Sequence, residues 1–207
     1  MAEAFVNVTE GSGKKLHAND RTIGANTVLD EVVVLGENYL ASYIANSSAG
    51  ASSTATAASH LFTLNAGASL KVRVRRIEMY QIGPATTAVL MDTRLLRTTT
   101  AAPTGGTVQN VNVMEPGDAA AGFTAMSLPT VKATEGATML MAAVYMMQTI
   151  GASAQLNEPV LVWDFDRPRS KPLIIAAGTT NGIAIKNVTA VAAGTVYFNV
   201  WADETSF

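Results

Sequence analysis

The sequence predicts an all-β protein, and three observations favour this class. Short runs rich in branched and aromatic residues recur along the chain, divided by clusters of Gly, Pro, Ser, Thr and Asn. Helical periodicity is almost absent, whereas several runs alternate apolar and polar residues. About nine or ten strands at such short spacing are typical of a β-sandwich or barrel. No break divides residues 28–207, so we expect a single antiparallel β-sandwich domain there.

Residues 1–27 differ from the rest because they are polar and loosely patterned, and we expect an extended N-terminal arm. Lys14 and Lys15 follow a Gly-Ser-Gly stretch that is similar to a phosphate-binding loop. However, Val8 stands where that loop needs its first Gly, and Lys15 stands where it needs Ser or Thr. A solvated arm is therefore the favoured interpretation.

The first predicted strands are apolar or alternating runs. Residues 32–35 predict a compact strand, residues 47–58 a flexible loop and residues 61–64 a short strand. From residue 70 apolar residues alternate with Lys and Arg, but the phase flips after Arg75 and Arg76. Because a slip of one residue turns the core side of a strand outward, we predict a β-bulge at this pair.

A return strand is predicted over residues 85–98, pairing back on residues 70–82 through a turn at Gly83 and Pro84. The segments that follow are, in chain order, a turn (103–107), a strand (108–114), a turn (115–118) and one helical turn (119–125). Residues 139–150 are apolar, and their length alone does not separate strand from helix, but the surrounding strands favour a strand.

The last third shows the clearest strand pattern. Residues 160–165 predict a strand with Leu161, Trp163 and Phe165 on one face. Residues 173–175 and 183–185 flank a loop that ends in Asn-Gly, which predicts a hairpin. The final strand alternates Val196, Phe198 and Val200 with Tyr197, Asn199 and Trp201.

The composition favours assembly. Charged residues make up 14% of the chain, against roughly 25% in a typical soluble domain. Such a surface packs readily against neighbouring subunits, because interface cores are depleted of charge. The net charge of −2 gives no sign of the strongly basic surface that nucleic-acid binding needs, and the absence of Cys excludes disulfides and thiolate metal sites. No signal peptide is visible, and no apolar run reaches the roughly 18 residues of a membrane span.

Two kinds of residue could carry chemistry. Asp164 and Asp166 lie two apart on a strand and point to the same side, so they could bind a cation or share a catalytic proton. Arg167 and Arg169 follow at once, and Asp–Arg pairing is the favoured outcome. His17 and His60 have no ligand or triad spacing, and we expect them in loops or at the surface.

Arginines are concentrated on the two strands predicted to pair. They are Arg73, Arg75, Arg76, Arg94 and Arg97. This basic strip admits two interpretations, which the sequence does not separate: cross-strand ion pairing on a solvated face, or a clamp onto acidic residues of a neighbouring subunit. Lys14, Lys15, Arg73, Arg75 and Arg76 are the candidate interface residues.

Several segments resemble structural proteins of tailed bacteriophages: the run over residues 70–81, the runs 94–100 and 103–107, and the segments 164–168 and 171–185. The resemblance covers most of residues 28–203 in a general strand and turn style. It implies a jelly-roll-like sandwich and, often, a homotrimer that decorates the capsid. It carries no catalytic residue or cofactor.

The sequence therefore predicts a non-enzymatic virion protein that decorates or cements the phage head. Its expected partners are further copies of itself and the major capsid protein, with no nucleic acid, membrane or cofactor. One alternative is a head-fibre or tail component that binds a receptor or glycan through Trp163, Trp201 or tyrosines. Both Trp lie in apolar strands, however, so core packing is the favoured interpretation for them. The other alternative is a carbohydrate-active enzyme that uses Asp164 and Asp166.

Overall fold

The computed structural model describes residues 18–23, 26–31, 41–54, 56, 58–147, 158–166, 172–188 and 194–205. The chain forms two compact units, Met1–Tyr39 and Leu40–Phe207. In the first unit β1 (Ala18–Ile23) and β2 (Asn26–Glu31) form an antiparallel hairpin. This hairpin lies where the sequence predicts an extended arm, and β2 crosses the boundary predicted at residue 28. The predicted strand 32–35, Lys14 and Lys15 are outside the described residues.

The second unit contains twelve strands and one short 3₁₀ helix, η1 (Ser47–Ala49). The strands are β3 (Ser42–Asn46), β4 (Ser52–Ser53), β5 (His60–Asn65), β6 (Lys71–Gly83), β7 (Val89–Thr99), β8 (Thr107–Val113), β9 (Thr124–Ser127), β10 (Thr134–Met146), β11 (Leu161–Asp164), β12 (Leu173–Ile175), β13 (Gly182–Asn187) and β14 (Thr195–Thr205). No α-helix occurs among the described residues, and none of their helices could span a membrane.

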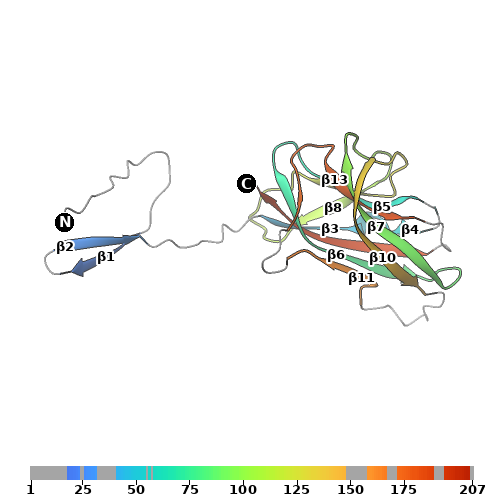
Figure 1. Ribbon diagram of the computed structural model, residues 1–207, viewed down its shortest axis with the longest axis horizontal. Coiled ribbons are helices and arrows are strands. Elements are labelled where there is room, and N and C mark those ends of the chain that lie inside the picture. Colours follow the sequence, from blue (N-terminus) through green and yellow to red (C-terminus); the bar gives the residue numbers. More distant parts are fainter. Residues whose placement is uncertain are drawn as a thin grey trace. The chain divides into compact units, whose positions relative to one another are not determined.

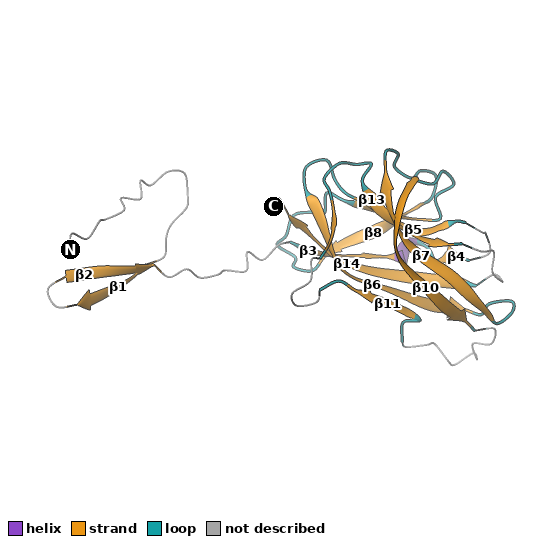
Figure 2. Ribbon diagram, viewed as in Figure 1, coloured by secondary structure: helices purple, strands orange, loops and turns teal. Residues whose placement is uncertain are grey.

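The twelve strands join into one curled antiparallel sheet (Figures 1 and 2). Its order is β10-β7-β13-β5-β9-β8-β3-β14-β6-β11, with β12 on β6 and β4 on β14. Strand β8 belongs to both halves, since residues 107–109 pair with β9 and residues 110–113 pair with β3. The sheet thus folds over itself at β8 into a sandwich. The predicted all-β, jelly-roll-like sandwich is confirmed.

A single apolar core fills the space between the two halves. Phe62 of β5 and Phe198 of β14 meet there with ring centroids 5.3 Å apart. Both side chains are fully buried, and each such burial contributes on the order of 1.5–3 kcal/mol. The core cluster takes residues from almost every strand of the second unit, so the two halves form one cooperative body.

The predicted bulge in β6 is confirmed. Along the pairing with β14, Ala202 lies opposite Val74 and Trp201 lies opposite Arg76, so Arg75 has no opposite residue. Val72 and Val74 are buried before the bulge, and Ile77 and Met79 are buried after it. The extra residue therefore keeps both halves of a long strand packed on the same core.

Three local predictions are wrong. Strands β6 and β7 do not pair, because the turn at Gly83 leads β7 into the opposite half of the sandwich. Likewise β12 pairs with β6, whereas β13 pairs with β5 and β7, so these two strands form no hairpin. Residues 119–125 contain no helical turn, and β9 begins within them. In the first two cases the chain does turn where predicted, but partners in the other half of the sandwich decide the pairing.

The seam between the two ends of the sheet is bridged by the Gln81 side chain, beside a backbone hydrogen bond from the Ala85 N–H to the Met147 carbonyl at 2.9 Å. The buried Gln81 amide donates to the Met147 and Gly83 carbonyls at 2.8 and 2.9 Å, and its oxygen accepts the Met147 N–H at 2.8 Å. The Gln81 amide thus substitutes for a backbone ladder between β6 and the end of β10.

Candidate functional site

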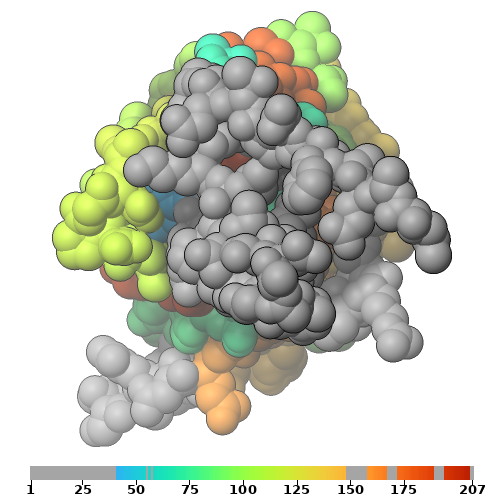
Figure 3. Space-filling view, turned by 90° about the vertical axis from the view of Figure 1, so that its left-hand side faces the viewer, coloured from blue at the N-terminus to red at the C-terminus, as the bar shows by residue number. Residues whose placement is uncertain are grey.

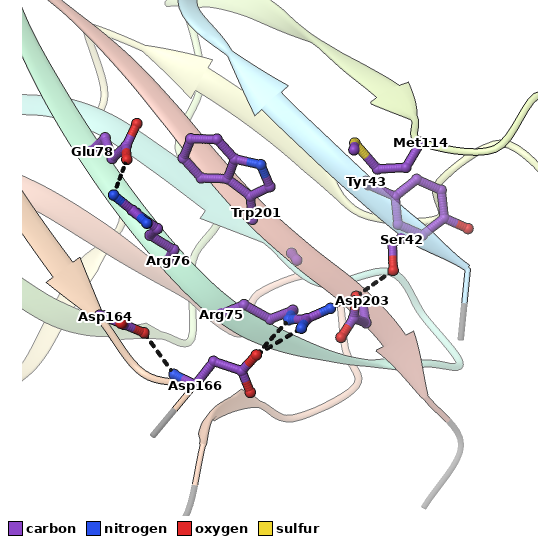
Figure 4. Close-up of a pocket in the computed structure, with 11 residues that line it drawn as sticks. Ser42, Tyr43, Arg75, Arg76, Glu78, Met114, Asp164, Asp166, Trp201 and Asp203 are labelled. Carbon is purple, nitrogen blue, oxygen red and sulfur yellow. Dashed lines mark hydrogen bonds and ion pairs between the residues drawn. The ribbon is translucent and has the colours of Figure 1, made fainter. Parts of the chain in front are cut away.

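The main cleft of the second unit lies on the outer face of β3, β14 and β6, beside the end of β11 (Figure 4). Its volume is about 620 Å³. The residues that line it are Ser42, Tyr43, Arg75, Arg76, Glu78, Met114, Asp164, Asp166, Trp201, Ala202 and Asp203. In Figure 3 the loop after β8, which begins at Met114, stands at the surface in yellow-green, and the β11 region projects in orange.

Strand register sets the central row of this cleft. Asp164 of β11 lies opposite Arg76 of β6, Arg76 lies opposite Trp201 of β14, and Trp201 lies opposite Ile44 of β3. The bulge adds Arg75 to the same face, because it allows two consecutive side chains to point outward. The bulge that keeps β6 packed on the core therefore also contributes Arg75 to the cleft.

Trp201 is the aromatic side chain at the centre of the cleft. Its indole lies between the Arg76–Glu78 pair and the side chains of Tyr43 and Met114 (Figure 4), and the Arg76 Cζ is 5.8 Å from the ring centroid. The sequence favoured core packing for both tryptophans. This is right for Trp163, which is buried, and wrong for Trp201. Trp201 alternates with the apolar Val196, Phe198 and Val200 along its strand, and this alternation could have placed its side chain on the outer face.

Asp166 is held by two guanidinium groups. Arg73 Nη2 donates to its Oδ1 at 2.7 Å, and Arg75 donates to its Oδ2 at 2.6 and 3.1 Å. The hydrogen bonds from Arg75 lower the pKa of Asp166, with both positive charges acting in the same direction. Asp166 thus pairs with arginines of β6. The predicted pairing with Arg167 and Arg169 stays a prediction, because both lie outside the described residues.

A second ion pair fixes the opposite side of the cleft. Arg76 Nη2 lies 2.6 Å from Glu78 Oε1, and the Tyr80 hydroxyl donates to Glu78 Oε2 at 2.6 Å. This hydrogen bond is the main reason that the pKa of Tyr80 is raised. The Glu78 carboxylate is thereby locked between two partners on its own strand.

The cleft carries more negative than positive charge. Arg75 and Arg76 stand against Glu78, Asp164, Asp166 and Asp203, which gives two positive and four negative groups, a formal charge of −2. Asp203 accepts from the Ser42 hydroxyl at 2.7 Å. The Asp164 carboxylate accepts the backbone N–H of Asp166 at 3.0 Å, and within the described residues it makes no other hydrogen bond or ion pair. Within that part, no group of three metal-ligating side chains is found.

The predicted basic strip does not form as one surface, since β6 and β7 lie in different halves. Arg73, Arg75 and Arg76 face the cleft region and hold carboxylates of their own chain. Arg94 pairs with Asp92 at 2.9 Å, and Arg97 donates to the Ile174 carbonyl. Burial lowers the pKa of Arg97. A contact of Arg73, Arg75 and Arg76 with another subunit stays a prediction.

His60 is not at the surface as predicted, but fully buried at the start of β5. Its Nε2 lies 3.1 Å from Glu135 Oε1, and Lys186 Nζ binds the same carboxylate at 2.7 and 2.8 Å. Burial lowers the pKa of His60 against the opposing effect of Glu135. Burial also opposes ionisation of Glu135, but its hydrogen bonds with Lys186 and His60 prevail and lower its pKa. His17 lies outside the described residues.

A third feature is the apolar outer side of β10. Strand register places Met141, Ala143 and Tyr145 beside Arg94, Asp92 and Leu90 of β7. Met141 is 69% exposed, Leu90 65% and Tyr145 56%. Within the described residues β7 is the only strand paired with β10, so β10 forms an edge of the sheet.

Comparison of the chain with protein-family models, with curated proteins and with solved structures gives no match. The functional argument therefore depends on the cleft, the buried His60 cluster and the β10 edge.

Proposed function

We propose that this protein is a structural subunit of a virus particle, built to associate with copies of itself and with a capsid shell. The observation that carries the proposal is the apolar edge at β10, which pairs with no described strand besides β7. The expected role is decoration of a tailed-phage head, with no enzymatic activity, and the virion is the expected location.

Edge strands normally carry features that prevent them from pairing with other chains. Charged side chains, proline and irregular register are the usual ones. Residues 136–147 contain no charged residue and no proline. Irregular register affects only the start of β10, because the pairing with β7 runs without a shift from Leu140 to Met146. A seven-residue segment of this kind supports pairing with another strand.

The segment is also complementary to itself. If two copies pair antiparallel around Ala143, Met141 of each copy lies opposite Tyr145 of the other, and Ala143 lies opposite Ala143. The Met–Tyr pairs bring sulfur against an aromatic ring, which is a favourable contact. No like charges meet, because the segment has none. Backbone hydrogen bonds and apolar contact then act together. A ring closed by heterologous contacts, such as the expected trimer, could also use this edge.

Self-association tests the proposal. The full chain is expected to form a dimer or a small ring at micromolar concentration, measured by light scattering after gel filtration. Met141→Lys places a charge on the edge and should weaken association about tenfold or more. The matched control is Val108→Lys, since Val108 is also apolar and 63% exposed but lies on β8. A wild-type chain that stays monomeric at high concentration would contradict the proposed edge.

The viral assignment has its own test. Mass spectrometry of purified virus particles from the source material should detect this chain in stoichiometric amounts with a major capsid protein. Deletion of residues 1–39, the first compact unit, should reduce its binding to those particles. Full occupancy after the deletion would show that the second unit alone makes the contact.

A further inference from the structure

We propose that the cleft around Trp201 binds a neutral saccharide, with a sugar ring stacked on the indole and its hydroxyl groups bound by the charged side chains at the rim. This inference is independent of self-association through β10, because the two features lie on different strands.

The aromatic surface is the first step. Trp201 lines the cleft, and no described residue accepts a hydrogen bond from its Nε1. A tryptophan in this position offers a broad apolar face together with one polar donor. A sugar ring has the matching character, since its C–H face is apolar and its edge carries hydroxyl groups.

The second step is the polar rim. Asp164, Arg76 and Trp201 follow one another across three strands in direct register. Among the residues that the structure describes, the Asp164 carboxylate binds only the Asp166 N–H, through one oxygen, which leaves acceptor positions for hydroxyl groups. The Arg76 guanidinium carries several N–H donors, and Glu78 binds only some of them. A carboxylate and a guanidinium beside an aromatic ring can bind neighbouring hydroxyl groups of one sugar.

The third step is charge. The lining has a formal charge of −2, from two arginines and four carboxylates. A phosphate, sulfate or sialic acid group would face repulsion, and a neutral ligand would not. The arginines are also neutralised in part by Asp166 and Glu78, which removes them as strong anion binders.

The fourth step is preorganisation and size. Ion pairs hold Arg75 and Arg76, and Asp203 is fixed by Ser42, so little side-chain freedom is lost on binding. The volume of about 620 Å³ falls within the range of small-ligand sites. The cleft is therefore suited to a short saccharide, and a shallow site of this kind predicts millimolar to micromolar affinity.

The test is a titration of the full chain followed by NMR of the tryptophan Nε1–H signals. The probes are neutral trisaccharides of glucose and of N-acetylglucosamine, with sialyllactose as the anionic probe and pentalysine as the cationic one. A neutral trisaccharide is expected to shift the Trp201 signal and leave that of the buried Trp163 unchanged.

Variants locate the binding. Trp201→Ala should weaken binding about tenfold or more, whereas Trp201→Phe should retain most of it. Tyr197→Ala is the matched control, because Tyr197 lies on the same strand and is 41% exposed but does not line the cleft. Thermal unfolding shows whether each variant is folded. The proposal is overturned if no neutral probe shifts the signal at 10 mM, if only pentalysine or sialyllactose does, or if Trp201→Ala binds as well as wild type.

Discussion

At the residue scale, the charged side chains of this protein act mostly on one another. Arg73 and Arg75 converge on Asp166, Arg76 holds Glu78, and Lys186 and His60 share Glu135. The first two groups lie at the cleft, and the third is in part buried. Their contributions differ because solvent screens the exposed pairs and leaves the buried group sensitive to protonation.

The buried His60 predicts a pH dependence of stability. Its pKa is lowered in the folded state, so the unfolded chain binds the proton more strongly. Stability is therefore retained above the ordinary histidine pKa of about 6.5 and lost as the pH falls below it. The lowered pKa of Glu135 adds a further loss at lower pH, as its carboxylate becomes protonated.

The measurement is the unfolding midpoint between pH 8 and pH 5. His60→Gln keeps a hydrogen-bonding group but cannot titrate, so its loss of stability between pH 7 and pH 5 should be smaller than that of wild type. His17→Gln, which removes the other histidine of the sequence, is the control. Parallel curves for wild type and His60→Gln would contradict the assignment.

Removal of the Asp166 charge is expected to lower the stability of the fold only slightly. Asp166→Asn removes the charge that Arg73 and Arg75 bind, but these groups are exposed to solvent. The expected loss of stability is under about 1 kcal/mol, and it should shrink further in high salt. Urea unfolding at low and high salt measures both. A loss of several kcal/mol would show that this ion-pair group has a larger structural role.

At the element scale, the bulge in β6 is the feature on which both core and cleft depend. It keeps Val72 and Val74 buried on one side of Arg75 and Ile77 and Met79 buried on the other. It also places Arg75 and Arg76 on the outer face beside Trp201.

Deletion of Arg75 separates the role of the extra residue from that of its side chain. Without the extra residue, the two ends of β6 can no longer both face the core, so either Val72 and Val74 or Ile77 and Met79 turn outward. At about 1.5–3 kcal/mol for each of these side chains, the expected loss is about 3–6 kcal/mol. Arg75→Ala keeps the bulge and should cost under about 1 kcal/mol. Equal losses for the two variants in urea unfolding would contradict the register argument.

At the scale of the whole molecule, Gln81 bridges the open ends of the sheet, together with the hydrogen bond from the Ala85 N–H to the Met147 carbonyl. Its amide makes three hydrogen bonds, two of them to the backbone of Met147. The seam matters because β10 and β6 lie near opposite ends of the strand order.

Gln81→Leu is expected to open this seam. It keeps the approximate volume but leaves the Met147 N–H without this acceptor, whereas the Met147 carbonyl keeps the Ala85 N–H. The expected cost is about 1–3 kcal/mol. Gln81→Glu keeps the acceptor for the Met147 N–H and should lie between wild type and Gln81→Leu. Hydrogen exchange should show faster exchange at the Met147 amide in Gln81→Leu. Unchanged exchange there would show that the seam is held elsewhere.

The sequence by itself determined the class of the fold and most strand positions. Alternation in β6, β11 and β14 was enough to assign the core faces and to predict the bulge, because side-chain parity is a local property of a strand. Trp201 could have been placed outward on the same ground.

Only the tertiary structure decided which strands pair. Local turn signals favoured hairpins for β6 with β7 and for β12 with β13, yet each pair is divided between the two halves of the sandwich. The same long-range packing buried His60 beneath Glu135 and brought Asp166 to Arg73 and Arg75. The physical reason is that parity and turn propensity depend on adjacent residues, whereas pairing depends on the burial of a shared core by distant ones.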